Sequence, residues 1–437
     1  MNISSVLKKK MFKETLIYSI GSFGSKILSF LLIPFYTYFL SKKDLGEYDL
    51  LITTISLFVP LVSLQISDSA YRWLIDKEKI SNEEKGKIIT NSLLALSTGY
   101  ILFFIVFLVY TSINDFQYHF YFIVLIFLNC LLPLLQNILR GLGETKKFAL
   151  NGLITTFLVV LFNFIFIYFL NLNVEGIFLA NIVAYVIACT MILTEINLVK
   201  HFKLIFWDKK LIKSMISYSL PLIPNLMGWW AISSASKFII LHYLGAESNG
   251  LYAVASRFPV LLLVINSVLL MPLQDRVLKE KDNLTFNKLL NKFIIFELVL
   301  AILLGILSPL ITKILVAEEY FSTWEYMPYL YLGVAYNAIA SFLGLKYQKD
   351  KNTLKITMTT LIGAIVSVVL SILLITKIGL QGVSIAFLVG FMIMVLTRYY
   401  DIFRREISIV FLTLIILAPI PIYLLTSLIS KIIEHLV

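Results

Sequence analysis

Three basic residues lie inside long apolar segments of this 437-residue sequence: Lys26 in GSFGSKILSF, Lys237 in SASKFIILHYLG and Arg257 in YAVASRFPV. If these segments cross a membrane, each cation costs on the order of 2.5–3.5 kcal/mol unless a partner or ligand compensates it. The acids nearest the membrane, Asp68 and Glu195 among them, lie toward the inner ends of their own segments, so no acid is expected at the depth of the cations. We therefore expect the three cations to line one unneutralised cavity that binds an anionic ligand. The simpler alternative is that each side chain reaches the membrane surface or bonds backbone carbonyls.

Several polar and aromatic residues in the same segments are further candidates for the lining of that cavity. They are Gln65, Asn225, Trp230 and Asn266. Amides in membrane helices more often bond neighbouring helices, and a tryptophan more often packs against lipid or other side chains. Glu297 is a candidate for coupling to an ion, with a local ion pair to Lys292 as the alternative.

No pattern for metal binding, for a cofactor or for catalysis accompanies these residues. The four histidines are scattered, and the two cysteines, Cys130 and Cys189, lie in apolar runs. The sequence has no D-x-D, no H-E-x-x-H and no nucleotide-binding loop. We therefore expect neither a metal nor a cofactor, and we do not expect an enzyme.

The segments that must position these residues are those of a polytopic all-α membrane protein. The sequence is 59% hydrophobic and 14% charged, whereas a soluble domain carries about 25% charged residues. A membrane-spanning helix needs about 20 apolar residues. Twelve such runs cover 15–40, 47–72, 88–110, 119–139, 148–170, 176–198, 214–244, 248–275, 289–314, 323–345, 353–375 and 379–399, with a thirteenth candidate at 407–430.

Lysine and arginine concentrate in alternate connections between these runs, beginning with Lys8, Lys9 and Lys10 near the N-terminus. By the positive-inside rule, this asymmetry predicts a cytoplasmic N-terminus. It also accounts for the net charge of +11 without a nucleic-acid partner.

Matching positions 204 residues apart indicate that the chain is a duplication. Leu40 matches Leu244, and Gly46 matches Gly250. A lobe of six helices begins and ends on the same side of the membrane because six is even. The second lobe therefore has the same orientation as the first, and the axis that relates them lies along the membrane normal. The predicted organisation is a lobe at 1–199, an amphipathic helix on the membrane surface at 200–213, a second lobe at 214–405 and an additional helix at 406–437.

A spaced Gly-x-Tyr after an apolar helix recurs in both halves. It occurs in SIGSFGSKILSFLLIPFYTYFLSKKDLGEYDL and again in PLIPNLMGWWAISSASKFIILHYLGAESNGLYAVASRFP. With the buried cations, these segments resemble bacterial polysaccharide-biosynthesis flippases of the Wzx type. Their superfamily also holds the multidrug and toxin extruders and the lipid II flippases.

The resemblance implies a V-shaped bundle with a central cavity in the bacterial inner membrane. Such a bundle moves an undecaprenyl-pyrophosphate-linked oligosaccharide from the inner to the outer leaflet, and cations in helices 1, 7 and 8 line its cavity. Lys26, Lys237 and Arg257 lie in the matching helices. The substrate and the membrane lipids are then the expected partners, together with a polysaccharide polymerase and glycosyltransferases of the same pathway.

Two alternatives compete with this interpretation. A multidrug or small-molecule antiporter of the same superfamily is the first, although an exporter of cationic compounds needs buried carboxylates where we expect cations. A membrane glycosyltransferase or polymerase is the second, although such an enzyme needs acidic or arginine-rich groups on sizeable loops, and the predicted outer loops are short.

Overall fold

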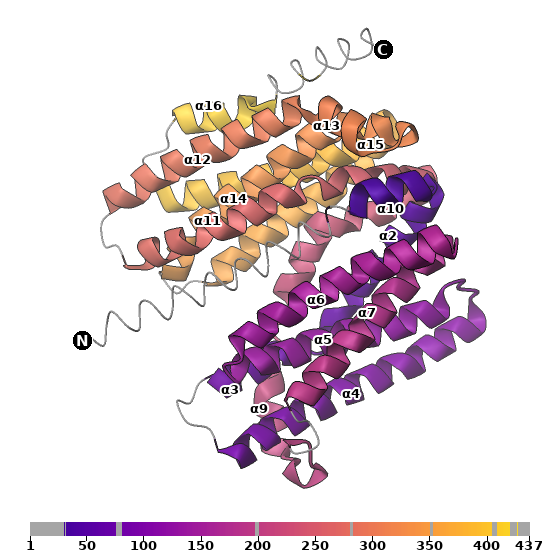
Figure 1. The fold of residues 1–437 in the computed structure, drawn as a ribbon. Coiled ribbons are helices and arrows are strands. Elements are labelled where there is room, and N and C mark those ends of the chain that lie inside the picture. Colours follow the sequence, from indigo (N-terminus) through magenta and orange to yellow (C-terminus); the bar gives the residue numbers. More distant parts are fainter. Residues whose placement is uncertain are drawn as a thin grey trace. The chain divides into compact units, whose positions relative to one another are not determined.

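The structure, a computed structural model, describes residues 30, 32–75, 81–196, 201–279, 283–349, 353–403, 409–419 and 426. Within these ranges the elements are helices, and none is a strand. Eight of the described helices are long and apolar enough to cross a membrane (Figure 1). The chain is therefore a polytopic all-α membrane protein, as the sequence predicts.

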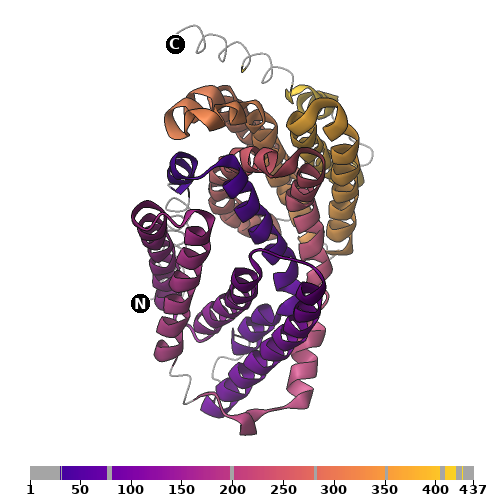
Figure 2. The same ribbon diagram turned by 90° about the vertical axis from the view of Figure 1, so that its right-hand side faces the viewer.

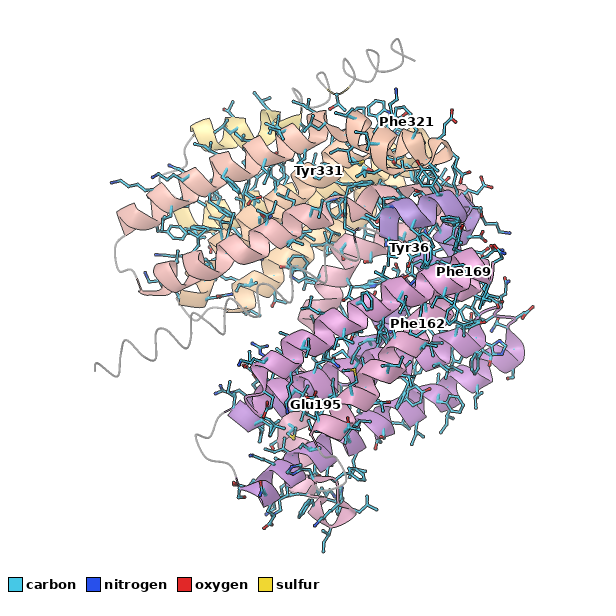
Figure 3. The ribbon with its side chains drawn as sticks, in the orientation of Figure 1. Tyr36, Phe162, Phe169, Glu195, Phe321 and Tyr331 are labelled. Atoms are coloured by element: carbon cyan, nitrogen blue, oxygen red, sulfur yellow. The ribbon has the colours of Figure 1, made fainter. Side chains whose placement is uncertain are left out.

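The chain forms two compact units, of which the first covers residues 51–227 of the described part. Its helices are the second part of α2 (Lys42–Val62), α3 (Ile66–Ile75), α4 (Asn82–Ile113), α5 (His119–Gly141), α6 (Thr145–Asn163), α7 (Asn173–Glu195) and α9 (Lys209–Ser219). The central helix is α5, which packs against α3 and α7 and buries Leu125, Leu134 and Ile138 completely. A π-helical segment, Phe164–Phe169, continues α6 and ends in the exposed Phe169 (Figure 3).

The second unit combines residues 30–50 with residues 228–437. Its helices are the first part of α2, most of α10 (Leu222–Arg257), α11 (Val260–Lys279), α12 (Asn283–Ile306), α13 (Ser308–Leu315), η3 (Glu318–Glu325), α14 (Met327–Lys349), α15 (Thr353–Phe403) and α16 (Ile409–Leu417). Its core is built around α14, which packs against α11, α12 and α15 and buries Tyr331 and Tyr336.

One cation of the second unit is buried within this core. Arg398 on α15 is 4% exposed. Its guanidinium donates to the hydroxyls of Thr359 and Thr360 and to the carbonyls of Ala340 and Ile356, over 2.7–3.2 Å. A buried charge is tolerated when hydrogen bonds satisfy it, so this arginine is a structural link between α14 and α15.

Helices lie over the predicted spans from 47–72 to 379–399, and proline or glycine marks several of their breaks. Turns at Pro221 and Pro259 separate α9 from α10 and α10 from α11, because proline cannot continue the backbone ladder. The long helices α10 and α15 each change direction at a glycine with positive φ, Gly245 at 82° and Gly379 at 59°, so each contains two spans. The span at 15–40 lies mostly outside the described residues, and half of the span at 407–430 does.

The predicted amphipathic helix over 200–213 is wrong. A single 3-10 turn, Leu204–Phe206, is followed by a non-helical Trp207, and α9 begins at Lys209. The boundary of the first unit also differs from the sequence-based lobe at 1–199, since α9 belongs to the first unit and residues 30–50 belong to the second.

Two positions that match in the predicted duplication, Gly46 and Gly250, lie close together within the second unit. Gly46 on α2 lies so close to α10 that a Cβ atom there would be 2.0 Å from the carbonyl oxygen of Ala246, and a Cβ atom at Gly250 would be 1.9 Å from that of Lys42. Ala246 and Lys42 are themselves 204 residues apart. The contact is therefore reciprocal, and it brings α2 and the second part of α10 side by side (Figure 1 and Figure 2).

Candidate functional site

The site begins with an ion pair between α2 and α10. The Lys237 ammonium lies 2.9 Å from Oδ1 and 2.8 Å from Oδ2 of Asp49. The two side chains are only 13% and 11% exposed. Asp49 thus neutralises Lys237, and the prediction that no acid lies at the depth of this lysine is wrong.

The close approach of α2 and α10 holds this pair in place. Glycine at 46 and 250 lets the two backbones meet, and the buried Asn249 amide donates to the Gly46 carbonyl over 3.0 Å. Asp49 follows Gly46 by three residues on α2, less than one turn along the helix. The backbone contact therefore fixes the height at which the Asp49 carboxylate meets α10.

Arg257, the last residue of α10, contacts two tyrosine rings of the same unit. Its guanidinium carbon lies 5.5 Å from the ring centre of Tyr36 and 5.7 Å from that of Tyr48, within the range of a cation–π contact. Tyr36 lies on the helix over residues 32–39, just before α2 (Figure 3). Among the described residues, no carboxylate forms an ion pair with Arg257.

The structure thus brings two of the three predicted cations to adjacent residues of α2. Lys237 contacts Asp49, and Arg257 contacts Tyr48. We call Tyr36, Tyr48, Asp49, Lys237 and Arg257 the Asp49 cluster. Lys26, the third predicted cation, lies outside the described residues.

Sequence reasoning missed Asp49, although a signal for it was present. Asp49 lies nine residues after Leu40, and Lys237 lies seven residues before Leu244, the position that matches Leu40 in the duplication. Consecutive helices run in opposite directions, so the two charges fall at similar depth below the same end. Comparing the distance of every acid, and not only of those near the inner ends, from the Leu40/Leu244 end of its helix identifies Asp49 as the partner of Lys237.

The other predicted lining residues have different surroundings. Gln65 belongs to the first unit, has a positive φ of 51° at the break between α2 and α3, and donates to Asp68 over 3.0 Å. Trp230 on α10 packs its ring 5.9 Å from that of Phe238. The side chain of Asn225 lies outside the described part of the structure.

A second polar site lies between α11 and α12. Glu297 on α12 is fully buried, and Asn266 on α11 is 3% exposed. The Asn266 amide lies beside the carboxyl group, yet neither carboxylate oxygen has a partner in hydrogen-bond geometry within the described part of the chain. Among the described residues, Lys292 forms no ion pair with Glu297. An unsatisfied buried carboxyl group is costly, so this position can take up a proton or a cation.

These features define a class of protein: a polytopic α-helical membrane protein with charged groups held inside its apolar helices. The fold is similar to that of a multidrug resistance transporter of the MATE family and MOP superfamily in an inward-facing conformation, with a TM-score of 0.70 at 14% identity over 92% of this chain and 96% of that chain. It is also similar to the lipid II flippase MurJ in an inward closed conformation, with a TM-score of 0.68 at 16% identity over 96% of this chain and 99% of that chain.

A MATE transporter from Vibrio cholerae has a TM-score of 0.61 at 16% identity, over 92% of this chain and 98% of that chain. No curated protein matches the sequence. The family model described as "Polysaccharide biosynthesis protein" matches residues 11–278. The chain therefore belongs to the polysaccharide biosynthesis protein family, and its fold is similar to those of these solved transporters and of the lipid II flippase.

Proposed function

We propose that this protein is a flippase that moves an undecaprenyl-pyrophosphate-linked oligosaccharide across the bacterial inner membrane by alternating access. Its family membership supports a role in polysaccharide biosynthesis, and the fold that it shares with transporters and a flippase supports movement of a substrate rather than catalysis. The proposal depends mainly on the surroundings of Arg257. This cation lies within apolar helices, makes cation–π contacts with two tyrosine rings and has no carboxylate partner among the described residues.

Arg257 suits the pyrophosphate group of such a cargo. A guanidinium group offers a planar fork of donors to phosphate oxygens, and the tyrosine rings contribute cation–π stabilisation without neutralising the charge. The remaining lining of the cavity, as the sequence predicts it, consists of Lys26, Gln65, Asn225, Trp230 and Asn266. An anionic cargo bound between these residues offsets the free-energy cost of placing their positive charges in the membrane.

Lys237 has a different role in this mechanism because Asp49 already neutralises it. In this mechanism the cargo phosphate displaces the Asp49 carboxylate from the Lys237 ammonium group and takes its place as the counter-ion. The displaced carboxylate then becomes a free acceptor for a proton or a cation. The Asp49–Lys237 pair therefore offers a way to couple binding of the anionic cargo to uptake of a positive charge.

Glu297 is the second group that we assign to ion coupling. Its carboxyl group is fully buried and has no hydrogen-bond partner among the residues that the structure describes, so a bound proton or cation removes the cost of its charge. We further propose that the N-terminus is cytoplasmic, as the positive-inside rule predicts, and that transport runs from the inner to the outer leaflet.

The test is a flipping assay with the purified protein in proteoliposomes and a labelled undecaprenyl-pyrophosphate oligosaccharide. We expect Arg257→Ala to lower the flipping rate roughly ten- to hundredfold, since a hydrogen bond to a charged group contributes about 1.5–3 kcal/mol. Arg257→Lys should recover part of the rate, because lysine supplies a point charge without the fork. Lys313→Ala, which removes an exposed lysine of α13, is the matched control. A wild-type rate in Arg257→Ala refutes the role of Arg257.

A second candidate function is favoured by the carboxylates that the structure places in the apolar helices. Asp49 and Glu297 are both buried, and an antiporter that exports cationic small molecules needs such groups. In the same proteoliposomes, this candidate predicts accumulation of a cationic dye that depends on Asp49 and Glu297. The flippase predicts no such accumulation and flipping of the labelled lipid instead.

A further inference from the structure

The first unit contains an apolar cavity of about 860 Å³ between α2, α4 and α9. Its wall includes Leu61, Val62 and Leu64 at the end of α2, the face of α4 from Leu94 to Val106, and Leu204, Trp207, Ile212 and Ile216. Among the described lining residues, the only polar side-chain groups are the Thr98 hydroxyl and the indole N–H of Trp207. Several lining side chains remain largely exposed, among them Leu102 at 61% and Val106 at 68%, so the cavity is an open groove.

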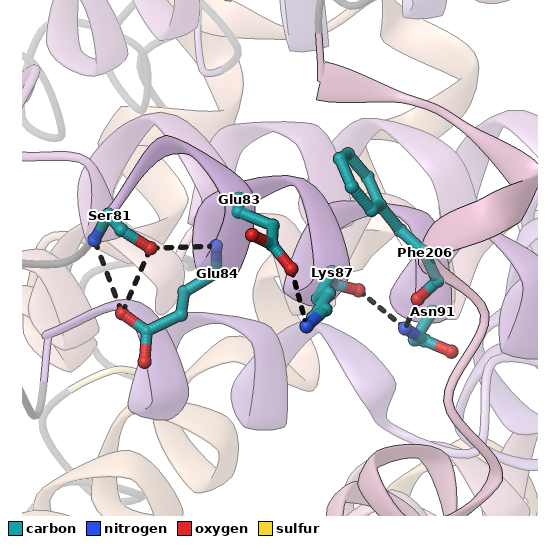
Figure 4. A network of polar contacts seen from close by, with 6 residues as sticks. All are labelled: Ser81, Glu83, Glu84, Lys87, Asn91 and Phe206. Carbon is teal, nitrogen blue, oxygen red and sulfur yellow. Dashed lines mark hydrogen bonds and ion pairs between the residues drawn. The ribbon is translucent and has the colours of Figure 1, made fainter.

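One end of this groove is formed by a turn that α4 holds in position. The Asn91 side chain donates to the Phe206 carbonyl over 2.8 Å (Figure 4). The same side chain accepts from the Asp208 backbone amide over 2.9 Å. The Phe206 ring packs directly on Gly86, where a Cβ atom would be 2.5 Å away. A capping box of Ser81 and Glu84 begins the same helix. The turn is therefore rigidly attached to α4.

The rigid turn presents large apolar side chains that the protein does not cover. Leu204 is 69% exposed, Ile205 is 87% exposed and Trp207 is 59% exposed. Beside them, Lys209 and Lys213 on α9 are exposed and share the helical face of Ile212 and Ile216, because residues three, four and seven apart lie on one side of a helix. Exposed apolar groups bordered by lysines are typical of contact with an anionic membrane surface.

The length of the groove matches one leaflet of a bilayer. From Leu94 to Val106, α4 rises by roughly 18 Å, and half of a hydrocarbon core measures about 15 Å. An apolar chain that starts at the turn can therefore lie along α4 to about the middle of the membrane. Lys209 begins α9 directly after the turn, and Lys213 follows one helical turn later, so both lysines lie near the end of the groove that the turn forms.

We propose that this groove binds one anionic phospholipid of the surrounding membrane, with an acyl chain along α4 and its phosphate at Lys209 and Lys213. The site lies within the first unit and shares no residue with the Asp49 cluster, so it is independent of the proposed flippase function. The complementary charge selects an anionic lipid, and the apolar wall selects its acyl chain.

The experiment is native mass spectrometry of the delipidated full-length protein titrated with phosphatidylglycerol or phosphatidylcholine. We expect a single phosphatidylglycerol to bind roughly thirtyfold more tightly than phosphatidylcholine, since each lysine near an anionic lipid contributes about 1 kcal/mol. Lys209→Gln with Lys213→Gln should abolish this preference. The matched control is Lys313→Gln with Lys377→Gln, which removes two exposed lysines of the other unit and should leave the preference intact.

A second pair of variants tests the groove itself. Thr98→Trp places a large side chain from α4 into the groove, whereas Ser97→Trp places it on the neighbouring exposed position, which does not line the groove. We expect only Thr98→Trp to weaken phosphatidylglycerol binding, by at least tenfold. Equal affinity for the two lipids, equal effects of both tryptophans, or binding of undecaprenyl phosphate without phosphatidylglycerol would each overturn the proposal. The lysine variants keep it testable if Thr98→Trp does not fold.

Discussion

Replacing one member of the Asp49–Lys237 pair should destabilise the second unit, and replacing both should restore much of the loss. The pair is 11–13% exposed and lies between helices, so removing one partner leaves an uncompensated charge in the membrane. Breaking a buried pair costs about 3–5 kcal/mol, whereas a neutral replacement of both partners is often close to neutral. We therefore expect a cost of about 3 kcal/mol for Asp49→Asn and for Lys237→Gln alone. The double variant should lose clearly less than the sum of these two losses.

Thermal unfolding of the purified protein in detergent, followed by size-exclusion chromatography with fluorescence detection, measures the effect. A loss of 3 kcal/mol corresponds to a fall in Tm of roughly 6 °C or more for a unit of this size. A double-mutant cycle isolates the interaction, because residues in contact deviate from additivity by about 0.5–3 kcal/mol. Additive shifts in Tm would refute the pairing of Asp49 with Lys237. An increase in Tm for Lys237→Gln would show that this lysine is unneutralised in the protein.

Three further predictions concern packing and topology. Gly46→Ala should reduce the yield of monodisperse protein strongly, because its Cβ atom would meet the Ala246 carbonyl, whereas Gly152→Ala on α6 has open space and should be tolerated; chromatography after extraction compares the two. Arg398→Lys should lower Tm by several degrees, since one ammonium group cannot serve four acceptors in that geometry; unchanged Tm contradicts this. Lys209→Cys should react with an impermeant maleimide only after cells are opened, and labelling of intact cells would contradict the predicted orientation.

The positions of the helices could be predicted because membrane spans depend mainly on the length of an apolar run. Breaks in the helices at Pro221 and Pro259 follow from the missing backbone donor of proline. The conformation of residues 200–213 could not be predicted in this way. Its alternating lysines and apolar residues suit a helix, but hydrogen bonds from Asn91, far away in the sequence, fix a turn instead.

The candidate site was predicted only in part. The basic residues were identified from their cost in the membrane, and the structure brings Lys237 and Arg257 to neighbouring positions of α2. Their partners could not be derived from composition, because Asp49 is 188 residues from Lys237 and the tyrosine rings under Arg257 are two among 23 tyrosines. The presence of positive charge in the apolar helices could therefore be predicted from the sequence. The residues that compensate this charge could be identified only from the structure.

The reciprocal contact between Gly46 and Gly250 has a consequence for the origin of the chain. Each glycine meets the segment that corresponds to its own, so the contact surface is complementary to itself. A surface of that kind pairs two identical copies about a twofold axis, which is how most homodimers assemble. If the predicted duplication holds, the first half of the chain carries both contacting surfaces, and an ancestor of half the present length dimerised through them before the two copies were fused.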